Sequence, residues 1–157
     1  MDTQTVIERL ESLMQLDHNA VSAYDQAIER VDVPAVREKL EEFKADHERH
    51  IVDLDTLIRR LGGTPKEISR DVKGSLIEGF TALRSITGTE GSLKAMKSNE
   101  QLTNRQYDDA LSLELPDEVR EVVERNRDDE RRHLAFIEAS IDRRVWETTG
   151  DQPEASP

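Results

Sequence analysis

The sequence contains no cysteine, which excludes disulfide bonds, iron–sulfur clusters and thiolate zinc sites. Aromatic residues are few, and no apolar run approaches the length that spans a membrane. The N-terminus lacks the basic and apolar segments of a secretory signal, so we expect a cytoplasmic protein. Basic residues are the minority, 22 against 34 acidic ones. The net charge of −12 therefore argues against nucleic acid and anionic membranes as partners.

The sequence is rich in Ala, Leu, Glu and Arg, a composition typical of a helical protein. Apolar residues recur at steps of three and four in four long stretches, which is the periodicity of helices packed through one face. This pattern predicts helices over about residues 3–30 and 34–61, a third from about residue 89 and a fourth from about residue 116. At 157 residues the chain is long enough for one domain with its own core.

The predicted domain is an all-α bundle over residues 1–147, made of two helical hairpins. Residues 66–88 form a long crossover in which residues 75–85 are expected to make a short helix. Such a connection lets the second hairpin lie beside the first. The polar residues 148–157 are expected to be a disordered tail.

One pattern of polar residues occurs twice in the chain. A carboxylate residue is followed by a tyrosine on one helix, and two ligand-type residues three positions apart follow on the next. Each matched position lies 83 residues after its counterpart, as Glu100 does after Asp17, so the two hairpins form an internal repeat. The first copy contains Asp17, Tyr24, His47 and His50, and the second contains Glu100, Tyr107, Glu130 and His133.

These residues fall on the apolar stripes and are therefore predicted to be buried. Asp17 and His47 are about equally far from the turn that joins their helices, so a rise of about 1.5 Å per residue brings them to the same height. Buried carboxylates must be paired or bound to a metal. Oxygen and imidazole ligands suit iron, manganese or zinc. The candidate metal ligands are Asp17, His47, His50, Glu100, Glu130 and His133.

A metal-free interpretation stays open, because buried carboxylates and imidazoles also satisfy one another by hydrogen bonds. Tyr24 and Tyr107 are either core residues or hydrogen-bond donors to carboxylate ligands. Asn126 lies on the stripe one turn before Glu130 and is a candidate to orient a ligand.

Two aspartates also repeat, Asp46 and Asp129, each four residues before a histidine. They lie one position off the stripe, so we interpret them as supporting or surface groups, not ligands. The dense charge elsewhere, such as Arg131-Arg132, is interpreted as a solvated exterior.

The chain resembles the ferritin-like superfamily of bacterioferritin and rubrerythrin, and within it a bacterial ferritin-like family of unknown function. The resemblance covers about residues 5 to 145. It implies a four-helix bundle with glutamate on the first and third helices and Glu-x-x-His on the second and fourth, at the six candidate positions. It rests on Asp17 with Tyr24, His50 leading into Leu61-Gly62-Gly63-Thr64-Pro65, Asn99-Glu100 with Tyr107, and Leu115-Pro116.

Two positions depart from the pattern of the superfamily. Asp17 stands where a glutamate is usual, which shortens its reach by one methylene. His47 stands where the second bridging glutamate is usual. Because imidazole donates through one nitrogen at a time, the sequence predicts that only Glu130 remains as a bridge. One metal, an asymmetric pair, zinc in place of iron, or no metal all stay open.

The leading hypothesis is a ferritin-like protein that binds one or two transition metals, iron or manganese foremost, in the bundle core. If two irons bind, the resemblance implies oxygen or peroxide as a further partner, with di-iron oxidoreductase activity in stress protection. The alternative is a non-enzymatic scaffold or dimer with a degenerate, metal-free core. Iron storage in a cage is a third hypothesis, although nothing in the sequence identifies cage contacts. A homodimer also stays open, because helical bundles of this kind often dimerise.

Overall fold

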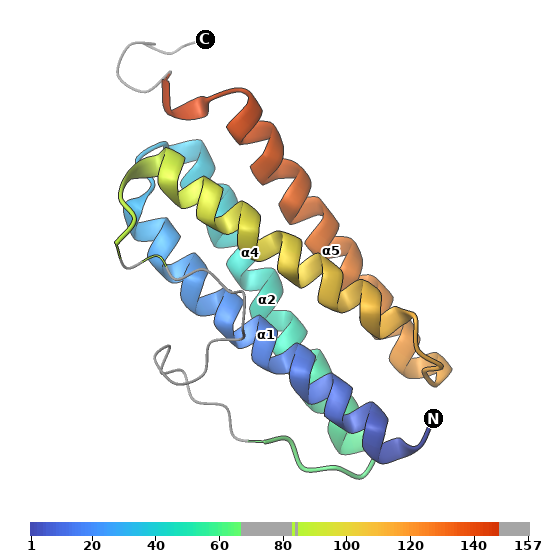
Figure 1. Cartoon of the computed structure of the whole chain (residues 1–157). Helices are drawn as coiled ribbons and strands as arrows, with labels where there is room; N and C mark the ends of the chain where they lie inside the picture. Colours follow the sequence, from blue (N-terminus) through green and yellow to red (C-terminus); the bar gives the residue numbers. More distant parts are fainter. Residues whose placement is uncertain (67–82, 84, 148–157) are drawn as a thin grey trace.

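The computed structural model describes residues 1–66, 83 and 85–147 and shows a bundle of four long helices (Figure 1). They are α1 (Thr3–Arg30), α2 (Pro34–Arg60), α4 (Gly88–Leu111) and α5 (Asp117–Asp142), and a short 3-10 helix, η1 (Val145–Glu147), follows. The predicted all-α bundle of four helices is thereby confirmed. The short helix predicted at 75–85 lies almost wholly outside the described residues, and the predicted tail lies entirely outside them.

Local chemistry explains where the first hairpin begins and ends. The Asp2 side chain accepts a hydrogen bond of 2.8 Å from the Thr5 backbone N–H and so caps the start of α1. Pro34 opens α2, where its missing N–H leaves no hydrogen bond unmade. Gly62 follows α2 with a φ of +89°, a left-handed conformation that glycine adopts without steric cost.

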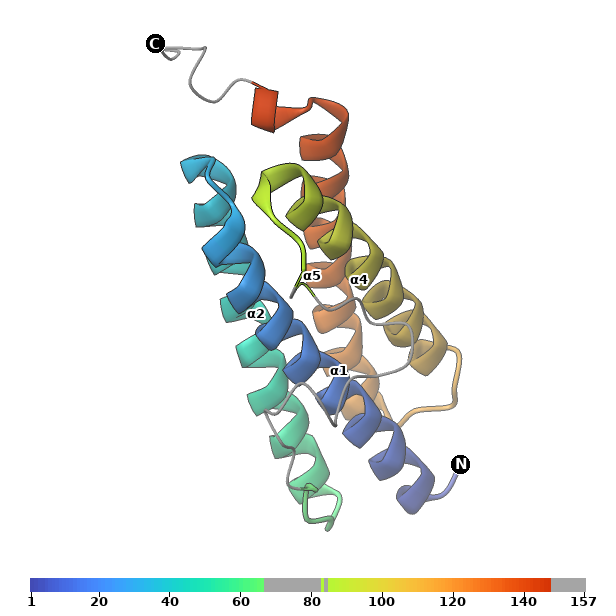
Figure 2. The same ribbon diagram turned by 60° about the vertical axis from the view of Figure 1, so that its left-hand side comes forward.

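The helices pack as two antiparallel hairpins lying side by side. α1 packs against α2 and α4 against α5, while α1 also contacts α4 and α2 contacts α5. Both views show α1 and α5 running in one direction along the bundle and α2 and α4 in the other (Figures 1 and 2). α2 therefore ends at one end of the bundle and α4 begins at the other (Figure 1).

The core is apolar toward both ends of the bundle and polar in the middle. On α2, Leu40 and Phe43 precede the polar stretch and Leu54 and Leu57 follow it, all buried. The other three helices repeat this order, so apolar layers close the middle from both ends. None of the described helices is long and apolar enough to cross a membrane.

Candidate metal centre

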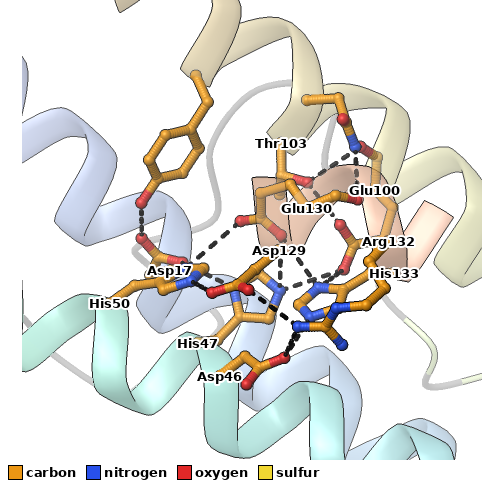
Figure 3. A network of polar contacts seen from close by, with 12 residues as sticks. Asp17, Asp46, His47, His50, Glu100, Thr103, Asp129, Glu130, Arg132 and His133 are labelled. Carbon is orange, nitrogen blue, oxygen red and sulfur yellow. Dashed lines mark hydrogen bonds and ion pairs between the residues drawn. The ribbon is translucent and has the colours of Figure 1, made fainter. Parts of the chain in front are cut away.

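All six candidate ligands lie together in the middle of the bundle, which we call the central layer (Figure 3). Asp17 comes from α1, His47 and His50 from α2, Glu100 from α4, and Glu130 and His133 from α5. Each is at most 1% exposed. The helices therefore bring together every residue of the predicted ligand set.

One half of the layer, the Asp17–His50 half, is built where α1 faces α2. Asp17 Oδ1 lies 2.7 Å from His47 Nδ1 and 3.1 Å from His50 Nδ1. His50 Nδ1 is also 3.7 Å from Glu130 Oε1. One ligand atom from each of these four residues lies within 4.8 Å of the others, which is close enough for one ion.

The other half, the Glu100–His133 half, repeats this arrangement between α4 and α5. His133 Nδ1 lies 3.1 Å from Glu130 Oε2 and 3.3 Å from Glu100 Oε2. His47 Nε2 is 3.1 Å from Glu100 Oε2 and 3.3 Å from Glu130 Oε2. These four residues form a second group within 4.8 Å. His47 and Glu130 belong to both groups.

The donor set also carries a direct sign that it fits a cation. Glu130 Oε1 is buried and has no hydrogen-bond partner among the described residues. A buried acceptor oxygen without a partner costs about 1–3 kcal/mol. A metal ion in the Asp17–His50 half would satisfy that oxygen, because His50 Nδ1 and Glu130 Oε1 belong to the same group.

Each tyrosine of the repeat crosses to the opposite hairpin. The Tyr24 hydroxyl donates to Glu100 Oε2, and the Tyr107 hydroxyl donates to Asp17 Oδ2 at 2.6 Å. Both rings are fully buried. The carboxylates of α1 and α4 are therefore each held by a phenol from the other helix. Glu100 Oε1 accepts a further bond of 2.7 Å from the Thr103 hydroxyl, a contact that has no counterpart in the first copy.

His50 and His133, two of the candidate ligands, are held from outside by the two repeated aspartates. His50 Nε2 lies 2.9 Å from Asp129 Oδ2, and His133 Nε2 lies 2.8 Å from Asp46 Oδ2. Again each contact joins α2 to α5. The N–H on Nε2 donates to the aspartate, which leaves Nδ1 facing the interior, the arrangement found around metal-bound histidines.

Two arginines complete this outer shell. Arg132 donates to both Asp46 and Asp129 at 2.9 Å, and Arg49 donates to the same two carboxylates. Arg132 is exposed, as expected of the solvated exterior, but its half-exposed side chain also bridges the two aspartates. The signal was present in the sequence, since Arg49 and Arg132 are also 83 residues apart.

Asn126 is fully buried, but neither atom of its amide has a hydrogen-bond partner among the described residues. It therefore orients none of the six ligands through a hydrogen bond in this structure. His18, the fourth histidine, is half-buried and lines a surface groove with Asp25 and Glu48 outside the central layer.

The buried charges compensate one another. Burial alone would raise the pKa of Asp17, but the charge of His50 and a hydrogen bond from His47 lower it to about 2. Burial would likewise raise the pKa of Glu100, and the charge of His133 holds it well below its usual range. Glu130 differs, because burial raises its pKa to about 7 despite the charge of His47.

The histidines show the reverse shifts. Burial lowers the pKa of His50, but the Asp17 charge and the bond to Asp129 raise it to about 9. For His133, the Glu100 charge and the bond to Asp46 outweigh burial and raise the pKa to about 10. In the metal-free protein the central layer is thus a network of imidazolium and carboxylate groups. Metal binding has to displace its protons.

These features define a ferritin-like four-helix bundle, and comparison with solved structures agrees. A ferritin-like, diiron-carboxylate protein from Bacillus anthracis str. Ames shares the fold with a TM-score of 0.70 and 19% identity, over 90% of this chain and 99% of that one. Dps from Staphylococcus aureus shares it with a TM-score of 0.72 and 16% identity, over 88% and 95%.

Within that class the chain belongs to a family described as a domain of unknown function (DUF2383), whose family model matches residues 5–113. That match includes Asp17, His47, His50 and Glu100, while Glu130 and His133 lie beyond it. No curated protein matches the sequence.

Proposed function

We propose that this protein binds two transition-metal ions, iron foremost, in the central layer, and that it oxidises Fe(II) or consumes peroxide there. The observation that carries the proposal is the pair of buried four-residue ligand groups that share His47 and Glu130. The unpartnered Glu130 Oε1 supports it. The titles of the two similar structures, a diiron-carboxylate protein and Dps, favour iron among the metals that such ligands suit.

The ligand roles follow from the contacts. Asp17 and His50 would hold one ion, Glu100 and His133 the other, and Glu130 would offer one oxygen to each. Iron held in this way supplies one-electron chemistry toward oxygen or peroxide. The protein supplies the surroundings in which that chemistry takes place.

The residues around the ligands fix their orientation and exclude water. Tyr24 and Tyr107 hold the two terminal carboxylates, and Phe43 packs against His133 with ring centroids 4.3 Å apart. Asp129 and Asp46 keep a proton on Nε2 of each ligand histidine, so that Nδ1 carries the lone pair for the metal.

Oxygen consumption after addition of Fe(II) tests the proposed activity. The wild-type protein should consume oxygen faster than the buffer does, and Glu130→Ala should lose this activity because it removes the residue shared by both groups. Glu124→Ala, an exposed position on the same helix, is the matched control and should behave like the wild type. Equal rates in all three proteins would defeat the proposal.

A metal-free scaffold is the second candidate, and the hydrogen bonds of the central layer favour it. Asp17, His47 and Glu100 already satisfy one another and the two tyrosines without an ion. On this view, mass spectrometry of protein grown with supplemented iron and manganese finds no stoichiometric metal, and chelators leave the melting temperature unchanged. About two metals per chain, lost in Glu130→Ala, would reject the scaffold.

A further inference from the structure

The histidine that replaces a bridging glutamate occupies a special position in the repeat. His47 and Glu130 are counterparts in the two copies, 83 residues apart. They face each other in the centre of the layer, with His47 Nε2 3.3 Å from Glu130 Oε2, and both are fully buried. The contacts of Asp17 with His50 and of Glu100 with His133 each lie within one copy, whereas the contact between His47 and Glu130 joins the two copies.

The two ring nitrogens of His47 face different halves of the layer. Nδ1 lies 2.7 Å from Asp17 Oδ1, an oxygen that also contacts His50 Nδ1. Nε2 lies 3.1 Å from Glu100 Oε2, which also contacts His133 Nδ1. Neither nitrogen is turned toward solvent or backbone. The two oxygens of Glu130 also face different halves, because Oε1 lies nearest His50 and Oε2 nearest His133.

We propose that His47 bridges the two metal ions as an imidazolate, binding one ion through Nδ1 and the other through Nε2. This inference rests on the proposed function, because it requires a metal pair. The sequence alone suggested that imidazole cannot replace the bridging carboxylate, but the position of the ring between the halves removes that objection. The protonated ring carries two N–H groups, one toward each half. Binding of the two ions replaces both protons, which leave to solvent, and the ring becomes an anion as a carboxylate would be.

The bridge fixes a measurable distance. Ions bound about 2 Å from each nitrogen, on opposite sides of a five-membered ring, lie about 6 Å apart. A pair bridged only by carboxylates lies about 3.5–4 Å apart. The separation therefore distinguishes an imidazolate bridge from the usual dinuclear site, whichever metal is bound.

The separation of the two ions can be measured in crystals of the protein loaded with Co(II), an ion that is stable in air. Anomalous scattering from the cobalt gives the position of each ion. The expected result is two Co(II) ions about 6 Å apart, each bonded to one His47 nitrogen. His47→Glu restores the usual residue and should shorten the separation by about 2 Å with two ions retained. His47→Asn and His47→Gln form a matched pair, because their amide groups come close to the positions of Nδ1 and Nε2 respectively. Asn should weaken the ion in the Glu100–His133 half, and Gln the ion in the Asp17–His50 half.

The outcomes separate this inference from the proposed function. Two ions about 4 Å apart in the wild type, with His47 bonded to one or neither, would overturn the bridge and leave the dinuclear site standing. A single ion bonded to one nitrogen would also overturn it. No bound Co(II) by mass spectrometry would overturn both. Circular dichroism of each variant establishes that the bundle is folded, and if His47→Glu does not fold, the wild-type distance alone decides.

Discussion

At the residue scale, the aspartates outside the ligand histidines offer a sharp test of the site. Asp129→Asn keeps the size of the side chain but removes the negative charge that holds the N–H of His50. Such outer partners are typically worth about 10- to 100-fold in metal affinity. We therefore expect Asp129→Asn, and Asp46→Asn at His133, to weaken Co(II) binding by that factor, measured by competition with a chelator.

Asp128→Asn is the matched control. Asp128 is the residue before Asp129, but its carboxylate is 71% exposed and contacts Arg127. This variant should leave the Co(II) affinity unchanged. Equal losses at positions 128 and 129 would show that the loss reflects the general reduction of negative charge on the helix. In that case the aspartates would not be acting through the histidines.

At the scale of the helices, periodicity was sufficient to predict the bundle. The prediction placed the first helix at residues 3–30 and the second from Pro34, as observed, because one unbroken apolar stripe and clear end signals define each. The position of the central layer followed from the same stripes, since Asp17 and His47 are equally far from the turn that joins their helices. The contacts between hairpins did not follow. Those from His50 to Asp129 and from His133 to Asp46 join residues 79 and 87 positions apart and depend on how α2 and α5 are rotated against each other.

The two phenols make a second test at this scale, because they tie one hairpin to the other. Tyr24→Phe and Tyr107→Phe each remove a buried hydrogen bond to a carboxylate across α1 and α4. A hydrogen bond to a charged group is worth about 1.5–3 kcal/mol. Each variant should lower the unfolding free energy of the metal-free protein by about that amount, measured by urea denaturation.

Ser140→Ala controls for the loss of a buried hydroxyl as such. Its Oγ has no hydrogen-bond partner among the described residues, so its removal should cost little. A loss in the tyrosine variants no larger than in Ser140→Ala would mean that the phenols do not hold the hairpins together.

For the whole molecule, the buried charges predict how the stability of the metal-free protein depends on pH. The pKa of His50 is raised to about 9 and that of His133 to about 10, so their contributions are complete below the unfolded value of about 6.5 and are lost as the pH rises through the folded values. The pKa of Glu130 is raised to about 7, so its contribution to stability is also lost as the pH rises, but at a lower pH than for the histidines. The melting temperature after chelation should therefore fall between about pH 6 and pH 9. His133→Gln should reduce that slope, and a flat or rising profile would contradict the charge assignment.

The stabilisation that bound metal adds should instead increase with pH. This pH dependence distinguishes a specific site from the general attraction of cations to a chain with a net charge of −12. Protons compete with metal for the imidazole nitrogens, so affinity increases with pH while the metal-free protein loses stability. Free metal at about 100 times the dissociation constant adds about 2.7 kcal/mol, or roughly 5–11 °C in melting temperature. We expect the difference between Co(II)-loaded and chelated protein, measured by calorimetry, to grow from about pH 6 to pH 8. The gain should disappear in Glu130→Ala and persist in Glu124→Ala. A gain that survives in both variants would place the ions on the acidic exterior, because Glu130 belongs to both candidate ligand groups of the central layer.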